Sequence, residues 1–96
     1  MKVITDQELR TLPILTKYVQ KENERQLQKW GVQTRTPFEY MTYLTEEVGE
    51  LAQAISEYVY RRESKNAIID EAIQVATLAL KIAEMYDTNA EKDNEE

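Results

Sequence analysis

The chain has 96 residues, of which 42% are hydrophobic, and its 18 acidic and 12 basic side chains give a net charge of −6. These totals allow one domain, exclude disorder throughout, and argue against a general nucleic-acid binder, which carries a basic surface. Because cysteine and histidine are both absent, acid–base chemistry falls to carboxylates, lysine or tyrosine, and any bound metal is held mainly by oxygen.

Helix start and stop signals divide the chain into four predicted helices, with no strand pattern and no internal repeat. Their expected ranges, in chain order, are 6–12, 13–30, 37–62 and 67–86. The clearest start is Thr36, which is placed to cap the third helix with Pro37 at its first position and Glu39 reaching back. Gly31 is placed to end the second helix, and Asn66 is a candidate cap for the fourth.

The amphipathic patterns predict an all-α antiparallel helical bundle of about four helices, with residues 1–86 as a single domain. Residues 87–96 are strongly acidic, and we expect them to form a disordered tail. A chain of this length buries only a modest fraction of its surface, so homo-oligomerisation is expected to complete the bundle. No apolar run is long enough to span a membrane and the N-terminus lacks a signal-peptide pattern, so the expected location is the cytoplasm, without a membrane partner.

The third predicted helix carries a dense group of acidic residues at Glu46, Glu47 and Glu50. At about 100° per residue, Glu46 and Glu50 share one helix face, and Glu47 lies roughly 60° further round from Glu50. Like charges four residues apart repel by a few tenths of a kcal/mol, and a divalent metal ion would relieve that repulsion. The alternative is that these residues form a solvated helix face opposite an apolar stripe.

A magnesium ion prefers octahedral coordination by oxygen and is usually held by a few carboxylates together with water and substrate phosphates. Glu46 or Glu47, with Glu50 and Glu71, can supply such a set if the third and fourth helices pack side by side. Gln74 lies one turn beyond Glu71, so its amide oxygen is within reach of the same site. The sequence therefore predicts a Mg²⁺ site between these two helices.

The same residues carry a resemblance to a known family. The segments concerned are ERQLQKWG at 24–31, Pro37, EEVGELAQA at 46–54 and EAIQVA at 71–76. Over residues 22–86 the pattern resembles the MazG-like all-α nucleoside triphosphate pyrophosphohydrolases. The resemblance implies homo-dimers or homo-tetramers that bind Mg²⁺, with Mn²⁺ as a possible substitute, through a Glu-Glu-x-x-Glu and a Glu-x-x-Asp segment. It also implies cleavage of a nucleoside triphosphate between the α- and β-phosphates, releasing the monophosphate and pyrophosphate.

Carried onto this chain, the resemblance makes Glu46, Glu47 and Glu50 the first segment and Glu71 the first acid of the second. Gln74 stands where the family usually has Asp, so one anionic ligand is missing. The resemblance implies that Glu50 and Glu71 are metal ligands. It further implies that one of Glu46 and Glu47 is a third ligand and the other orients the attacking water, without indicating which is which.

Substrate binding is expected to involve basic side chains and a tryptophan. Arg25, Lys29 and Arg35 flank the end of the second helix and can meet phosphates, and Lys81 can point a cation at the same groups. Trp30 can stack on a base or close the pocket. The alternatives are that the cations are solvated and that Trp30 packs the following loop.

Two other functions compete with the enzyme hypothesis. One is a non-catalytic, degenerate helical module that binds a nucleotide or a partner protein, with which Gln74, the small size and the acidic tail are compatible. The other is a purely structural helix bundle, which explains the apolar stripes but not the group of carboxylates. A nucleoside triphosphate pyrophosphohydrolase is the function that explains both.

Overall fold

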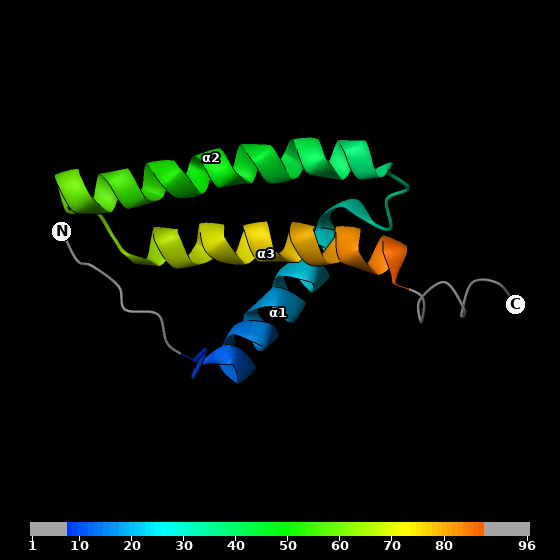
Figure 1. The fold of residues 1–96 in the computed structure, drawn as a ribbon, viewed down its shortest axis with the longest axis horizontal. Helices are drawn as coiled ribbons and strands as arrows, with labels where there is room; N and C mark the ends of the chain where they lie inside the picture. The colour runs from blue at the N-terminus through cyan, green and yellow to red at the C-terminus, as the bar shows by residue number, and fades with distance from the viewer. Residues whose placement is uncertain (1–7, 88–96) are drawn as a thin grey trace, which may run out of the picture.

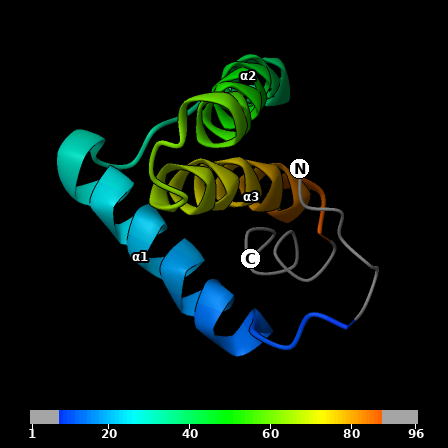
Figure 2. The same ribbon diagram turned by 90° about the vertical axis from the view of Figure 1, so that its left-hand side faces the viewer.

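The computed structural model describes residues 8–87, which fold into three α-helices without a strand. These are α1 (Leu12–Trp30), α2 (Pro37–Arg61) and α3 (Asn66–Tyr86). Helices α2 and α3 lie side by side and antiparallel, while α1 packs against α3 and runs across it at a steep angle (Figures 1 and 2). The all-α class predicted from the sequence is confirmed, with α3 as the central helix. Among the described residues, no helix combines the length and the apolar character needed to cross a bilayer.

Helix α2 begins at the predicted capping signal. The Thr36 hydroxyl accepts a hydrogen bond from the Glu39 N–H at 3.2 Å, and the Glu39 carboxylate accepts one from the Thr36 N–H at 3.0 Å. Pro37 occupies the first turn, where its missing N–H costs nothing. The helix ends one residue before the prediction, because Arg62 adopts the left-handed conformation (φ 55°) and returns its N–H to the Glu57 carbonyl.

The other two long helices also end or begin within one residue of the prediction. Gly31 ends α1 as expected, with φ 71° and its N–H donating to the Leu27 carbonyl at 2.8 Å. The prediction that Asn66 caps α3 is wrong, because Asn66 is already the first helical residue. The Ser64 hydroxyl instead accepts a hydrogen bond from the Asn66 N–H at 3.1 Å, so a side chain two residues earlier satisfies this donor.

The short helix predicted over 6–12 falls partly outside the described residues, and the part that is described differs from the prediction. Residues 8–11 contain a turn and no helix, and α1 starts at Leu12, one residue before Pro13. Proline cannot continue a preceding helix but suits the first turn of a new one, so Pro13 fixes this start. The acidic tail predicted for 87–96 lies outside the described residues, except for Asp87.

The chain encloses very little core. Within residues 8–87, the buried apolar side chains are Ala54 on α2 and Leu78 on α3, joined by Thr77, whose hydroxyl donates to the Ile73 carbonyl at 2.8 Å. Many large apolar side chains are exposed instead, among them Leu12, Tyr18, Met41, Val48, Ile55 and Leu80. The three helices therefore leave apolar faces that no other described residue of this chain covers.

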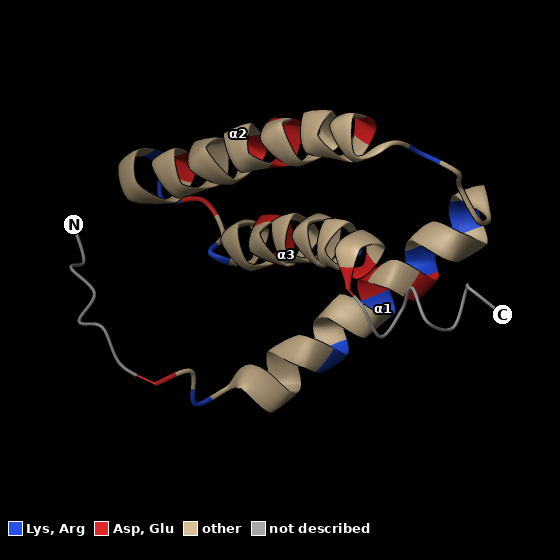
Figure 3. Cartoon of the chain, turned by 45° about the vertical axis from the view of Figure 1, so that its right-hand side comes forward, with Lys and Arg blue, Asp and Glu red and all other residues tan. Residues whose placement is uncertain are grey.

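Charge is divided unevenly among the helices. Basic residues repeat every four positions along α1, at Lys17, Lys21, Arg25 and Lys29, whereas most side-chain charges on α2 and α3 are acidic (Figure 3). A four-residue repeat keeps the four cations on one side of α1. The acidic surface of the α2–α3 pair thus lies next to a helix that carries four cations on one side.

Candidate metal centre

The packing of α2 on α3 brings three carboxylates together. Glu47 and Glu50 from α2 and Glu71 from α3 each offer an oxygen, and these oxygens all lie within 4.8 Å of one another. Ala54, which is buried, lies one to two turns further along α2, so the helical period places residues 47, 50 and 54 on the same side of the helix. The expectation that these two helices pack side by side is confirmed, and Glu47, Glu50 and Glu71 are called the carboxylate cluster below.

Glu71 contributes a buried oxygen atom to the carboxylate cluster. Its Oε2 atom is buried and has no hydrogen-bond partner among the described residues. A buried carboxylate oxygen without a partner is unusual, because it loses its hydration and gains nothing in return. A cation at this position would supply the missing interaction.

Glu47 shows the electrostatic cost of bringing the three groups together. Burial and the neighbouring carboxylates of Glu71 and Glu50, to which its protonated form can donate, raise the pKa of Glu47 to about 8. All of these causes favour the neutral acid over the carboxylate. Without a cation, the surroundings of Glu47 therefore favour its protonated form.

Gln74, on α3, contacts the carboxylate cluster through a hydrogen bond. With its amide oriented to donate, Nε2 lies 3.0 Å from Glu47 Oε2 and 3.3 Å from Glu47 Oε1. This orientation is assigned from the hydrogen-bond partners. Gln74 thus orients Glu47 without adding negative charge, and the carboxylate cluster consists of three carboxyl groups.

A cavity of about 340 Å³ opens beside the carboxylate cluster and is called the aromatic cavity below. Its lining includes Trp30, Tyr40, Tyr43, Arg25, Arg35 and Glu46, together with Glu47 and Gln74. Glu46 therefore lies beside the carboxylate cluster without belonging to it, whereas Glu47 belongs to both. The two adjacent glutamates, which the sequence could not distinguish, occupy different places.

The predicted substrate-binding residues at the end of α1 gather around Trp30. The Lys29 ammonium lies 4.6 Å and the Arg25 guanidinium 5.9 Å from the centroid of its ring. Arg25 also pairs with the Glu22 carboxylate at 2.7 Å. Trp30 is 54% exposed, so it is not buried as a packing anchor in this chain. Arg25 and Trp30 line the aromatic cavity, whereas Lys29 does not.

Arg35 and Tyr43 form a second pair at the aromatic cavity. Arg35 Nη1 donates to the Tyr43 hydroxyl at 2.9 Å, and its guanidinium lies 5.0 Å from the ring centroid. Neither Tyr43 nor Tyr40 is among the site residues predicted from the sequence. The available signal is their spacing: positions 40, 43 and 47 lie on one side of α2, so both rings accompany Glu47.

Lys81 is placed apart from the carboxylate cluster. Its ammonium donates a short hydrogen bond to Gln26 Oε1 on α1, and burial lowers the pKa of Lys81. It does not line the aromatic cavity, although Gln26 does. The structure therefore brings Glu47, Glu50, Glu71 and Gln74 together and leaves Lys81 to act on the aromatic cavity only through Gln26.

Comparison with known proteins assigns no family to the chain. No family model matches it, and neither a curated protein nor a solved structure does. The motif residues and the geometry described above are therefore the observations that bear on function.

Proposed function

We propose that this protein is a Mg²⁺-dependent pyrophosphohydrolase that converts a nucleoside triphosphate to the monophosphate and pyrophosphate. The observation that carries the proposal is the convergence of Glu47, Glu50 and Glu71 from two helices beside a cavity lined by aromatic rings and arginines. Carboxylates suit a hard divalent cation, aromatic rings suit a nucleobase, and guanidinium groups suit phosphates. All three features meet at one place on the molecule.

The donor set fits Mg²⁺, with Mn²⁺ as a possible substitute. The three carboxylates of the cluster are close enough to share one ion, and Glu71 Oε2 is a buried acceptor without a partner in the part of the chain that the structure describes. Glu47, Glu50 and Glu71 would hold the ion, while Gln74 keeps Glu47 oriented. A bound divalent ion neutralises phosphate oxygens and makes a neighbouring water easier to deprotonate.

The reaction requires the chain to position a water opposite the leaving group. The water oxygen forms a bond to the α-phosphorus while the bond between that phosphorus and the α,β-bridging oxygen breaks, so pyrophosphate leaves with the bridging oxygen. Glu46 lines the aromatic cavity without joining the carboxylate cluster, which supports its role as the base that orients this water and accepts its proton. Glu47 then takes the role of the third metal ligand.

Substrate binding is assigned to the lining of the aromatic cavity. Trp30, Tyr40 and Tyr43 offer ring faces for the base, and Arg25 and Arg35 offer guanidinium groups to the phosphates. The Lys29 ammonium lies over the Trp30 ring, and the Lys81 ammonium donates a hydrogen bond to Gln26. Each lysine thus positions a side chain that lines the aromatic cavity.

We further infer that the protein is a homo-dimer or homo-tetramer. Met41, Val48 and Ile55 on α2 lie seven residues apart and are 52%, 48% and 43% exposed. This spacing forms the apolar seam of paired helices, and a second copy of the chain would cover it. An apolar cavity of about 560 Å³ between α1 and α3 adds to the uncovered surface. Helices from two copies would complete a bundle of more than three helices.

The experiment that tests this function is a pyrophosphate-release assay with ordinary and modified nucleoside triphosphates in millimolar Mg²⁺. Wild type is compared with Glu50→Gln and with the control Glu57→Gln, which is on the same helix but outside the carboxylate cluster. We expect the rate of pyrophosphate release to fall at least about a hundredfold in Glu50→Gln and to stay at the wild-type value in Glu57→Gln. Equal rates for wild type and Glu50→Gln would refute the assigned site.

The alternative function is a non-catalytic helical module that binds a nucleotide or a partner protein. The observation that favours it is Gln74, whose uncharged amide donates a hydrogen bond to the Glu47 carboxylate. The family that the sequence resembles usually has an Asp at this position, which would supply a further anion. Such a module would bind nucleotide in the aromatic cavity without releasing pyrophosphate. The same assay separates the two functions when nucleotide binding is measured beside turnover.

A further inference from the structure

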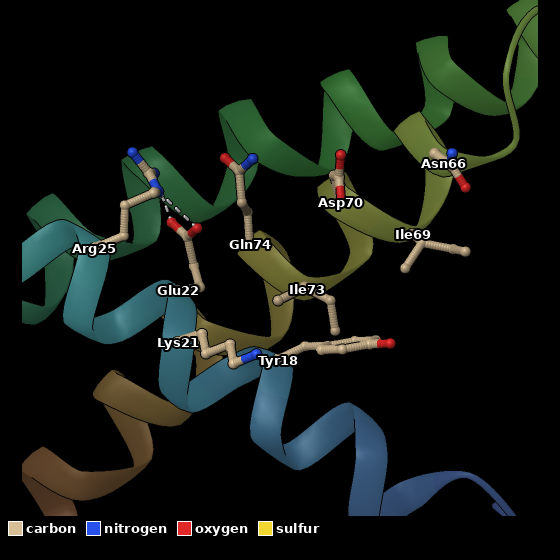
Figure 4. A pocket seen from close by; sticks show the side chains of 9 residues that line it. All are labelled: Tyr18, Lys21, Glu22, Arg25, Asn66, Ile69, Asp70, Ile73 and Gln74. Atoms are coloured by element: carbon tan, nitrogen blue, oxygen red, sulfur yellow. Dashed lines mark hydrogen bonds and ion pairs between the residues drawn. The ribbon is translucent and has the colours of Figure 1, made fainter.

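A second cavity adjoins the proposed active site. It has a volume of about 580 Å³ and lies between α1 and α3, and it is a different cavity from the apolar one described above. It is called the α1–α3 cavity below. Arg25 and Gln74 line both this cavity and the aromatic cavity, so the two meet at these side chains. In Figure 4, Arg25 and Gln74 lie together at one end, and Asn66 and Ile69 lie at the other.

The α1 wall of this cavity carries two cations one helical turn apart. Arg25 is paired with the Glu22 carboxylate through hydrogen bonds at 2.7 and 2.9 Å (Figure 4). Lys21 also lines the cavity but makes no hydrogen bond or ion pair within residues 8–87. The acid on the opposite wall, Asp70, lies one turn from Gln74 on the side away from Arg25 (Figure 4). The Lys21 ammonium, which has no partner within residues 8–87, therefore lines a cavity that meets the aromatic cavity at Arg25 and Gln74.

The proposed reaction divides its substrate into a nucleoside monophosphate and pyrophosphate. The two cavities differ in their content of aromatic rings and of unpaired cations. The aromatic cavity contains Trp30, Tyr40 and Tyr43, which suit a nucleobase. The α1–α3 cavity contains a single aromatic ring, that of Tyr18, and the uncommitted cation of Lys21. We propose that Lys21, together with Arg25, binds the β- and γ-phosphates of the substrate and hence the leaving pyrophosphate. This assignment rests on the proposed function.

The chemistry of the leaving group explains why a cation is useful there. As the bond from the α-phosphorus to the bridging oxygen breaks, that oxygen keeps the electron pair, and negative charge grows on the departing pyrophosphate. A lysine ammonium donates charge-assisted hydrogen bonds to phosphate oxygens and stabilises this charge. Lys21 is therefore expected to contribute to both product affinity and turnover.

The test is inhibition of triphosphate hydrolysis by inorganic pyrophosphate in the presence of Mg²⁺, measured for Lys21→Ala, Lys21→Arg and Lys17→Ala. Lys17 is on the same helix one turn earlier and does not line the α1–α3 cavity. Lys21→Ala should raise the inhibition constant for pyrophosphate about tenfold and lower kcat/KM by a similar factor. Lys21→Arg should recover most of both, and Lys17→Ala should stay within about twofold of wild type.

Inhibition by the nucleoside monophosphate provides a second readout, which should be unchanged in Lys21→Ala because that product lies in the aromatic cavity. Active wild type with the same pyrophosphate inhibition constant in Lys21→Ala would overturn the Lys21 assignment and leave the proposed function standing. Equal losses of pyrophosphate inhibition in Lys17→Ala and Lys21→Ala would also overturn the assignment, since they would indicate a general attraction of phosphates to the positive charge of α1. Inactive wild type would overturn the function and this assignment together.

Discussion

The Glu47 carboxylate on α2 accepts hydrogen bonds from the Gln74 amide on α3, with nitrogen–oxygen distances of 3.0 and 3.3 Å. This contact joins the two helices at the carboxylate cluster and leaves its charge to Glu47, Glu50 and Glu71. An aspartate at position 74 would add a fourth carboxyl group at the same place. An uncharged side chain at position 74 therefore favours the stability of the metal-free protein, whereas an anionic one would favour affinity for the metal.

Replacing Gln74 with Asp should shift that balance. We expect Gln74→Asp to melt at a lower temperature than wild type in the presence of a chelator, because the added carboxylate repels its neighbours. With millimolar Mg²⁺ the variant should gain more in melting temperature than wild type, because a fourth anion strengthens metal binding. Thermal unfolding followed by circular dichroism measures both values. A variant that melts like wild type with and without Mg²⁺ would show that position 74 does not act on the site.

The pH dependence of stability should report the raised pKa of Glu47. Its pKa is about 8 in the folded chain against 4.5 for the ordinary side chain, so the folded state binds more protons between these two values. The free energy of unfolding of the metal-free protein should therefore fall as the pH rises from about 4.5 to about 8. The slope should stay well below the limit of about 1.4 kcal/mol per pH unit, because Glu47 is partly solvated.

Urea unfolding at several pH values in the presence of a chelator measures this slope. Glu47→Gln removes the titrating group, so its slope should be flatter than that of wild type over the same range. Millimolar Mg²⁺ should also flatten the slope of wild type, because a bound cation favours the carboxylate. An identical slope in wild type and Glu47→Gln would contradict the assignment of the raised pKa.

The roles of Glu46 and Glu47 should be distinguishable when turnover and metal binding are measured on the same variants. Glu46→Gln should lower kcat by about a hundredfold or more, as expected for loss of a general base, while the rise in melting temperature with Mg²⁺ persists. Glu47→Gln should reduce both, because Glu47 belongs to the carboxylate cluster. The reverse pattern would exchange the two roles.

The exposed apolar seam of α2 should control the oligomeric state. Val48→Lys places a charge in the middle of the seam formed with Met41 and Ile55, and we expect it to shift the protein towards the monomer and to lower its melting temperature. The control is Ser56→Lys, an exposed position on α2 that does not belong to the seam. Sedimentation equilibrium measures the mass of each. A wild-type monomer, or an unchanged oligomer in Val48→Lys, would contradict the proposed interface.

The features that the sequence predicts well are those with local causes. The start of α2 follows from Thr36, Pro37 and Glu39, and the end of α1 follows from the left-handed conformation that Gly31 adopts easily. The meeting of Glu50 and Glu71 follows from two amphipathic helices that pack side by side. Each of these depends on residues within a few turns of one another or on a simple pairing of helices.

The features that the sequence does not predict depend on how the helices are rotated and crossed. Whether Glu46 or Glu47 joins the carboxylate cluster depends on the rotation of α2 about its own axis, since the two side chains are about 100° apart. The steep crossing of α1 over α3 places Lys81 against Gln26 and opens the α1–α3 cavity in front of Lys21. A helical periodicity contains no information on the angle between two helices.

The most direct test of the central claim is a titration with Mn²⁺, followed by electron paramagnetic resonance, of wild type, Glu71→Gln and Glu84→Gln. Glu84 is the matched control, since it is an acidic residue on α3 outside the carboxylate cluster. We predict that wild type and Glu84→Gln bind Mn²⁺ with the same affinity and that Glu71→Gln binds at least about tenfold more weakly. Equal Mn²⁺ binding by all three proteins would contradict a metal site built from Glu47, Glu50 and Glu71.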